Sequence, residues 1–310
     1  MLERSTYREF CRAAQVPVFA RDWYLDSTCR DGQWAAAELY EGAQLIGIWP
    51  YYRKRKGPFR YLTLPPRTKF LGPYLLPEYR SAPECIQHYR ALYRALPPFH
   101  SITQNCFYHL STDQPFPIPQ VQSQCFYSYR LDELDDLEAL YAGFTRYYRN
   151  SILKKAPQKV TIRHDLGVDA YYEINRKTYA RQGIPPPFSR AVLRSNMEAL
   201  QRARAGRAFF AVDAEGQLHA AALLVWDERT AYYHSAGGDP ALRKSGAGIY
   251  LVWAMIRYAV EELGLRHFDF AGSMIPAIEK IWLNFGAKKH TYYHFEKHDW
   301  LFQLAQRWKP

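Results

Sequence analysis

Apolar and polar residues follow the same order in two separate stretches of the chain. From Ala35 to Thr63, apolar and aromatic runs are interrupted first by Glu41-Gly42 and then by a basic turn. From Ala208 to Gly238 the order is repeated, with Glu215-Gly216 opposite the first Glu-Gly pair. Short apolar runs separated by turn residues are typical of strands joined in hairpins. Each stretch therefore predicts a three-stranded meander.

A helical pattern follows each predicted meander. Residues 83–96 form the first such stretch and residues 246–263 the second. In the second stretch the apolar residues recur at the spacing of one helix face, namely Ile249, Val252, Trp253, Ile256 and Val260. The two halves therefore resemble duplicated domains, although short hairpins are common enough that chance similarity is a competing interpretation.

The remaining patterns complete an α/β chain. Acidic residues from Asp132 to Glu138 fit the first turns of a helix, where the helix dipole favours negative charge. Two further helices are expected at 168–181 and, capped by Ser189, up to residue 205. The C-terminal part predicts a strand at 266–273, a helix at 275–287 and a strand at 289–297. Since 310 residues suit two domains of ordinary size, we expect a division into residues 1–130 and 131–310.

Composition narrows the class of protein. Hydrophobic residues make up 48% of the chain, enough for packed cores. We find no run of about 18 uncharged apolar residues, and the first residues are charged where a signal peptide is apolar, so a cytoplasmic location is expected. The five cysteines are scattered without CxxC spacing, which suggests neither a disulfide framework nor a zinc knuckle.

A surplus of basic residues points to anionic partners. The formal net charge is +11, which suits a phosphorylated donor, RNA or an anionic membrane surface, or else a solvated surface with no such partner. No DNA partner is expected. A cationic junction beside Tyr147 and Tyr148 could face an anionic substrate, although the helix dipole explains part of the asymmetry without a ligand. Its basic residues are Arg146, Arg149, Lys154, Lys155 and Lys159.

The segment DPALRKSGAGIYLVWAMIRYAVEEL places a glycine-containing loop between a predicted strand and a predicted helix. The first N–H groups of a helix have no intrahelical partner and lie at the positive end of its dipole, so they bind phosphate readily. Gly246 and Gly248 lack side chains that would keep a diphosphate away, and Arg243 and Lys244 add positive charge. Neither GxxxxGK[ST] nor GxGxxG is present, and a ligand-free glycine turn is the competing interpretation.

The spelling Arg243-Lys-Ser-Gly246-Ala-Gly248 is R-x-x-G-x-G, which resembles the acyl-CoA loop of the GNAT acyltransferase superfamily. The wider segment from YYHSAGG to FDFAGS, followed by FGAKK, is similar to Fem-type aminoacyltransferases and their CelD-type relatives. FTRYYRNSILKKAPQ resembles a basic helix of their second domain, and RTKFLGPYLL at residues 67–76 resembles a Leu-Gly-Pro segment of their first. The resemblance spans most of the chain.

This resemblance implies two tandem GNAT-like domains, each a mixed, mostly antiparallel sheet flanked by helices. The first domain would lie on the acceptor side without a donor loop, and the second would bind the donor. The expected donor-binding residues are Ser235, Arg243, Lys244, Ser245, Gly246, Ala247 and Gly248. The candidate catalytic residues are His234, Asp269 and Ser273, although a lone His or Asp on a strand more often has a structural role. Candidate substrate contacts are Lys69, Tyr74, Arg149 and Tyr233.

One position departs from the common GNAT pattern. Four residues before Gly286, where many family members carry a tyrosine that protonates the leaving thiolate, this chain has Trp282. Indole does not donate a proton at ordinary pH. Either another group acts as the acid, or the leaving group is the ribose hydroxyl of a tRNA, or a thiolate with a pKa of about 8.5 leaves without help. Fem-type relatives also lack this tyrosine as a rule.

Three functions follow from these observations. The leading hypothesis is an N-acyltransferase that uses acyl-CoA or a related thioester and a small-molecule or peptide amine. The second is a tRNA-dependent aminoacyltransferase acting on a cell-envelope precursor or peptide, and the third is a noncatalytic binding module, with peripheral contact to an anionic membrane. No metal is expected, because His290, His294 and His298 lie in an extended segment, where four residues span about 13 Å.

Overall fold

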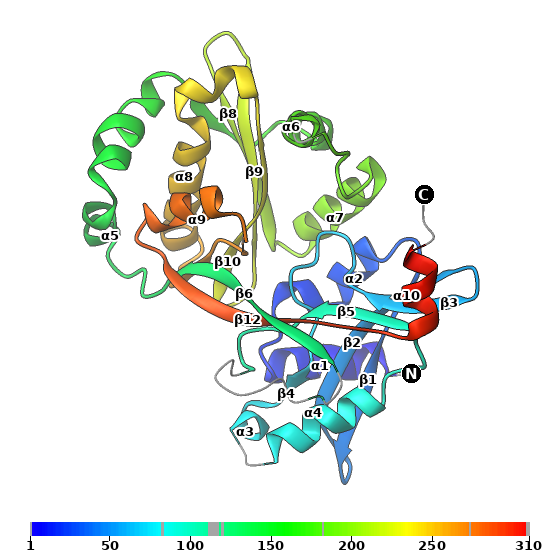
Figure 1. Ribbon diagram of the computed structural model, residues 1–310. Coiled ribbons are helices and arrows are strands. Elements are labelled where there is room, and N and C mark those ends of the chain that lie inside the picture. The colour runs from blue at the N-terminus through cyan, green and yellow to red at the C-terminus, as the bar shows by residue number, and fades with distance from the viewer. Residues whose placement is uncertain are drawn as a thin grey trace. The chain divides into compact units, whose positions relative to one another are not determined.

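The computed structural model describes residues 2–81, 84–110, 118, 121–181, 183–272 and 274–307 (Figure 1). The chain forms two compact units, Met1–Phe126 with Thr291–Pro310, and Tyr127–His290. It passes from one unit to the other within strands β6 (Gln122–Leu131) and β12 (Lys288–His298). The predicted second domain extends to residue 310, whereas residues 291–310 join the first unit because β12 pairs with a strand of that unit.

The first unit contains a mixed sheet in the order β1-β2-β3-β5-β12, with β4 paired to β2. Strands β1 to β3 form the predicted antiparallel meander, β3 and β5 are parallel, and β12 is antiparallel to β5. The strand bounds are β1 (Gln33–Glu41), β2 (Gln44–Lys56), β3 (Phe59–Thr63), β4 (Tyr74–Leu75) and β5 (Ser101–Asn105). The helices are α1 (Arg4–Ala13), η1 (Val18–Ala20), α2 (Asp22–Thr28), α3 (Pro77–Arg80), α4 (Cys85–Arg94) and α10 (Trp300–Arg307).

Both faces of this sheet are buried. Ile48 and Trp49, adjacent on β2, point to opposite faces because side chains alternate along a strand. Ile48 belongs to a cluster with residues of α1 such as Phe10, whereas Trp49 packs with Leu92 of α4 and with Phe295. Helices on both sides therefore exclude water from the sheet.

The second unit contains a mixed sheet in the order β6-β11-β10-β9-β8-β7. Its meander, predicted at residues 208–238, is confirmed as the antiparallel strands β8 (Gly206–Val212), β9 (Leu218–Trp226) and β10 (Thr230–Gly238). Strand β7 (Thr161–Arg163) pairs with β8, β11 (His267–Asp269) is parallel to β10, and β6 is antiparallel to β11. The helices are α5 (Leu137–Gly143), η2 (Tyr148–Leu153), η3 (Ala156–Gln158), α6 (Val168–Ala180), α7 (Arg190–Arg202), η4 (Pro240–Ser245), α8 (Ala247–Glu261) and α9 (Pro276–Leu283).

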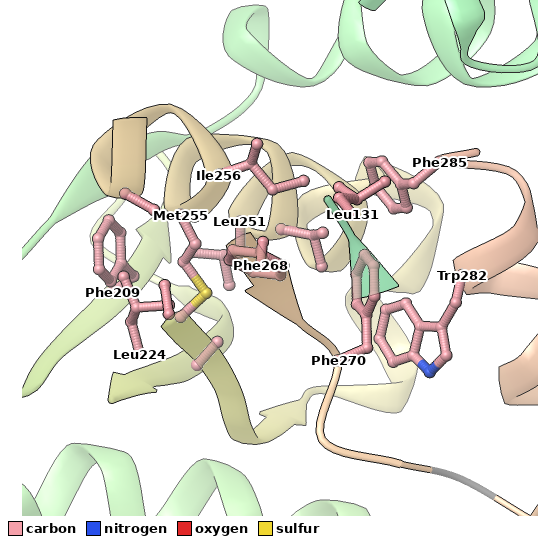
Figure 2. Close-up of a cluster of buried hydrophobic side chains, with 14 of the residues drawn as sticks. Leu131, Phe209, Leu224, Leu251, Met255, Ile256, Phe268, Phe270, Trp282 and Phe285 are labelled. Carbon is pink, nitrogen blue, oxygen red and sulfur yellow. The ribbon is translucent and has the colours of Figure 1, made fainter. Parts of the chain in front are cut away.

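Helix α8 supplies much of the core of the second unit. Its residues Leu251, Met255 and Ile256 are almost fully buried and pack in one cluster with Phe209 and Phe268 of the sheet (Figure 2). Full burial of one such side chain contributes roughly 1.5 to 3 kcal/mol. Helix α6 lies on the other side of the sheet from α8 (Figure 1). The predicted helix at 246–263 is therefore confirmed, and its apolar face holds it in place.

The predicted helix at the acidic segment begins later and ends earlier than the charge pattern suggests. Asp136 accepts hydrogen bonds from the amides of Glu138 and Ala139, so α5 starts at residue 137. It ends at Gly143, because Phe144 is extended. Of the basic residues that follow, Arg149 lies in the separate short helix η2, Arg146 precedes it, and Lys154, Lys155 and Lys159 flank the short helix η3. Among the described residues, none of the helices is both long and apolar enough to cross a membrane.

Candidate active site

Strands β10 and β11 separate partway along their length. They are paired only from Thr230 and His267 to Tyr232 and Asp269, whereas β10 continues beside β9 as far as Gly238. The chain after Asp269 turns through left-handed backbone conformations at Ala271 and Gly272, with φ of 56° and 83°. We call this separation of the two strands the splay. It leaves one edge of β10 without a paired strand in the described part of the chain.

Asp269 stabilises the turn that opens the splay. Its side chain is fully buried, and Oδ1 accepts hydrogen bonds from the Ala271 amide at 2.7 Å and the Ser128 hydroxyl at 2.6 Å. The guanidinium of Arg130 lies 4.0 Å from the other carboxylate oxygen. These contacts fit the structural alternative for Asp269, and we do not assign it to proton transfer. Ser273, the other candidate near this turn, lies outside the described residues.

A bulge in β10 places His234 at the start of the splay. The register with β9 shifts between Tyr233 and Ser235, and His234 is buried with 5% of its surface exposed. Its Nδ1 lies 3.0 Å from the Ser235 hydroxyl. The hydroxyl of Tyr171 on α6 donates to the Ser235 carbonyl oxygen at 2.8 Å and lies 2.8 Å from the Ser235 hydroxyl. We call His234, Ser235 and Tyr171 the histidine cluster.

Close packing of α6 against β10 makes this cluster possible. A Cβ added at Gly237 would lie 2.7 Å from backbone atoms of Asn175, so only glycine fits at this crossing. Sequence reasoning missed Tyr171, which lies 64 residues from Ser235. No spacing in the sequence signals a contact over that distance. Ser235, an expected donor-binding residue, is therefore also part of the histidine cluster.

The predicted donor loop occupies the corner between β10 and α8, as the sequence indicates. After β10 the chain forms the short helix η4, and α8 begins at Ala247. The Ser245 hydroxyl accepts a hydrogen bond from the Ala247 amide at 3.3 Å and donates to the Leu242 carbonyl at 2.8 Å. Arg243 and Lys244 are exposed, and neither forms an ion pair within the described ranges of the chain. Ala247 is buried, so its side chain contributes to the packing of the corner.

The two glycines of the loop have different roles. Gly246 has φ of 79°, and a Cβ added there would lie 2.8 Å from Cγ2 of Ile152. Its lack of a side chain is thus required by the protein itself, which corrects the interpretation that it makes room for a diphosphate. Gly248 is exposed, and a Cβ added there would meet no atom within 4 Å. The open approach to the first turn of α8 is therefore at Gly248.

The cationic junction lies next to this corner. Ile152 of η2 contacts Gly246, and the Lys159 ammonium lies 3.4 Å from the carbonyl oxygen of Lys244. Arg149 is half-buried, while Lys154 and Lys155 are exposed. Two basic segments that are far apart in sequence thus surround the start of α8. Together they favour an anionic ligand at this position.

An aromatic group lies at the opening of the splay. The Trp282 indole stacks on Phe270 with ring centroids 4.3 Å apart (Figure 2). It also meets Tyr233 edge-on, with ring centroids 5.1 Å apart. Burial raises the pKa of the Tyr233 hydroxyl well above its ordinary value, so this group stays protonated. Tyr233, a candidate substrate contact, therefore lies where the two strands separate.

The two candidate substrate contacts of the first unit, Tyr74 and Lys69, differ in how deeply they are buried. Tyr74 is fully buried in that unit's core, packed against His109, and burial raises the pKa of its hydroxyl strongly. A side chain enclosed in this way contacts no substrate from solution, which corrects the prediction for Tyr74. Lys69 is half-buried, and its carbonyl accepts a hydrogen bond from Asn105 at 3.0 Å.

The evenly spaced histidines of the C-terminal strand have separate partners. His290 lies 3.1 Å from Asp132, His294 pairs with the Asn105 side chain at 2.7 Å, and His298 pairs with the Ser101 hydroxyl at 2.7 Å. Across the residues that the structure describes, no group of three or more His, Cys, Asp or Glu side chains is arranged to hold a metal ion.

Comparison with known proteins adds a family match for part of the chain and a fold. Residues 134–276 match the family described as "Acetyltransferase (GNAT) domain". The whole fold is similar to the crystal structure of FemX, at 12% identity and a TM-score of 0.71, over 98% of each chain. It is also similar to the C-terminal domain of a putative lysylphosphatidylglycerol synthetase from Agrobacterium fabrum, at 10% identity and a TM-score of 0.53, over 98% of this chain and 96% of that one.

A third similar structure is a tandem GNAT protein from the clavulanic acid biosynthesis pathway, at 14% identity and a TM-score of 0.52. The alignment covers 91% of this chain and 96% of that one. No curated protein sequence gave a significant match. At identities this low, the structural likenesses concern the fold, which is that of tandem GNAT proteins.

Proposed function

Residues 134–276 form a GNAT acetyltransferase domain, and from this premise we propose that the protein transfers an acyl group from an acyl-CoA thioester to an amine. The observation that carries the proposal is the open first turn of α8. Gly248 is exposed and unobstructed there, and Arg243 and Lys244 are exposed beside it. A diphosphate at this turn would accept a hydrogen bond from the backbone amide of Gly248 and gain from the positive end of the helix.

The histidine cluster would accept the proton of the attacking amine. An acyl thioester supplies an activated carbonyl whose C–S bond breaks as the C–N bond forms, and the thiolate leaves with the electron pair. His234 would accept the proton that the attacking nitrogen loses. The Ser235 hydroxyl forms a hydrogen bond with Nδ1 of His234, and the Tyr171 hydroxyl of α6 forms one with Ser235. These contacts fix the orientation of the imidazole ring. The acceptor is a small-molecule or peptide amine.

The cationic junction supports a second candidate, transfer of an aminoacyl group from tRNA. Lys159, directly after η3, adjoins the donor corner, and with Arg149 of η2 it would contact nucleic-acid phosphates. The likeness to FemX in fold points the same way. The thioester remains the first candidate, because a thiolate leaves without protonation whereas a ribose alkoxide needs a proton to leave.

Binding measurements with one glycine variant test the donor. In Gly248→Val, a bulky side chain would cover the first turn of α8 while meeting no protein atom within 4 Å at Cβ. We expect CoA affinity measured by titration calorimetry to fall at least about tenfold, which corresponds to about 1.4 kcal/mol. The thermal midpoint should change little.

The matched control is Gly143→Val, at an exposed glycine of α5 that also has open space around an added Cβ. This variant should bind CoA as the wild type does. Unchanged CoA affinity in Gly248→Val would reject the donor site. Wild-type binding to aminoacyl-tRNA but not to CoA would replace the first candidate with the second.

A further inference from the structure

Trp282 carries a buried hydrogen-bond donor that the protein does not use. Only 5% of the residue's surface is exposed, and its indole N–H has no hydrogen-bond partner within the part of the chain that the structure describes. A buried polar group left without a partner is costly, and most such groups in native proteins have one. The N–H is therefore available to an acceptor that is not part of the protein.

The position of the indole connects it with both strands of the splay. Its ring packs on Phe270 and Tyr233, and these residues directly follow Asp269 and Tyr232, the last pair that joins β11 to β10. Figure 2 shows the indole nitrogen at the edge of the ring that is turned away from Leu131, Phe268 and Phe285. The N–H thus points away from these three residues, on an indole whose ring contacts both Phe270 and Tyr233.

Among the described residues, no neighbouring side chain accepts a hydrogen bond from this N–H. Glu279, which precedes Trp282 by three residues on α9, accepts a hydrogen bond from the hydroxyl of Tyr129. Phe270 and Phe285 are apolar, and the ring of Tyr233 presents its edge to the indole. An indole N–H donates only and does not titrate, so it suits an uncharged carbonyl oxygen.

We infer that the indole N–H of Trp282 donates a hydrogen bond to the acyl carbonyl oxygen of the donor bound in the splay. This inference rests on the proposed function, because it needs the thioester arm to reach the point where β10 and β11 separate. In this role Trp282 holds and polarises the carbonyl without transferring a proton. The position that carries an acid in other GNAT enzymes is then a fixed hydrogen-bond donor in this protein.

Two ligands that differ in one oxygen test the inference. S-ethyl-CoA has a thioether where acetyl-CoA has a thioester, so it lacks only the carbonyl oxygen. Wild-type protein should bind acetyl-CoA more tightly by roughly three- to tenfold, the range for one hydrogen bond. Trp282→Phe keeps an aromatic ring against Phe270 and should bind both ligands equally. The control Trp253→Phe, on α8 and packed against Phe144, should keep the wild-type preference.

Indole proton NMR gives a readout that does not depend on activity. The chain has eight tryptophans, and the resonance missing from Trp282→Phe identifies Trp282. In the wild type this resonance should move downfield with acetyl-CoA and remain in place with S-ethyl-CoA. Should the variant fail to fold, the wild-type titrations with the two ligands still decide the question.

The outcomes separate the two proposals. If wild-type protein binds both ligands equally and no indole resonance distinguishes them, the role of Trp282 is rejected while the donor site stands. If neither ligand binds, the donor site is rejected and the inference is rejected with it. A preference for acetyl-CoA that persists in Trp282→Phe assigns the carbonyl contact to another group and also overturns the inference.

Discussion

The two units build the same arrangement of strands but end the third strand differently. Both have an antiparallel meander, a parallel strand beside its third member and an antiparallel strand next to that. In the first unit β3 ends at Thr63, one residue after its last pair with β5. In the second unit β10 continues to Gly238, well past its last pair at Tyr232. The splay therefore results from the length of one strand.

The connection to the next helix differs as well. In the second unit only the short helix η4 separates β10 from α8, so the helix begins beside the free edge of the strand. In the first unit β4 and α3 lie between β3 and α4. A helix start acts on a ligand only within about its first turn, since the dipole effect falls off over that distance. The comparison thus explains how a duplicated fold carries one candidate donor site.

Buried polar residues on the two corresponding strands give the largest expected effect. Asp269 on β11 and Gln104 on β5 are both fully buried, and Gln104 accepts a hydrogen bond from the Trp49 indole at 2.6 Å. Removing one partner of a buried charged network costs about 3 to 5 kcal/mol. Removing a neutral partner costs about 1 to 3 kcal/mol. We expect Asp269→Ala to lower the free energy of unfolding more than Gln104→Ala, as measured by urea denaturation.

Equal losses of unfolding free energy in the two variants would mean that Asp269 contributes no more to stability than Gln104. In that case the turn at Ala271 would persist without the carboxylate, and CoA affinity would be unchanged in Asp269→Ala. Loss of stability together with loss of CoA affinity would instead connect the turn with the splay.

We expect a loss of folding stability at acidic pH that originates in the first unit. Burial, together with the nearby charge of Arg80, lowers the pKa of His109 to about 3. The unfolded chain takes up a proton near pH 6.5 whereas the folded protein does not, so stability is present above pH 6.5 and is lost as the pH falls toward 3. Between pH 6.5 and 4.5 this loss is about 2 to 3 kcal/mol.

His109→Phe should remove that part of the pH dependence, measured as the shift in urea midpoint between pH 7 and pH 4.5. The control is His164→Gln in the second unit, where the ring is exposed and contacts the Ala208 carbonyl. A pH dependence that is the same in His109→Phe and in wild type would assign the acid sensitivity elsewhere.

Local patterns predicted those parts of the fold that depend on neighbouring residues. The sequence predicted three such features, because each depends on residues close together in the chain. They are the meander at 208–238, the apolar face of α8 and the cap at Ser189. The pairing of β12 with a strand of the first unit could not be predicted, since it depends on pairs of distant residues such as His294 and Asn105. Nothing in the sequence near either residue indicates that pairing.

The candidate site was predictable to the same extent. The strand-to-helix corner followed from glycines and basic residues close together in sequence, and the structure confirms where it lies. The role of Gly246 did not follow, because Ile152 approaches it from a segment about 90 residues earlier. Tyr171 was missed for the same reason. Contacts between distant segments determine what each residue of the corner does.

The smallest expected effect compares three glycines with left-handed backbones. Gly42 and Gly216 are the corresponding hairpin turns of the two units, with φ of 58° and 81° and open space around an added Cβ. Gly246 has a similar φ of 79° but faces Ile152. Alanine at either hairpin should cost about 1 kcal/mol, mainly from backbone strain. Gly246→Ala should cost about 1 to 2 kcal/mol more, because its Cβ also crowds Ile152.

Urea denaturation of the three variants measures the difference, and Ile152→Ala in the Gly246→Ala background tests its cause. If crowding is responsible, the double variant should lose less stability than the sum of the two single changes, since the two residues share one contact. Additive losses would show that Ile152 is not the obstacle. The glycine would then be required by its backbone conformation alone, as in the hairpins.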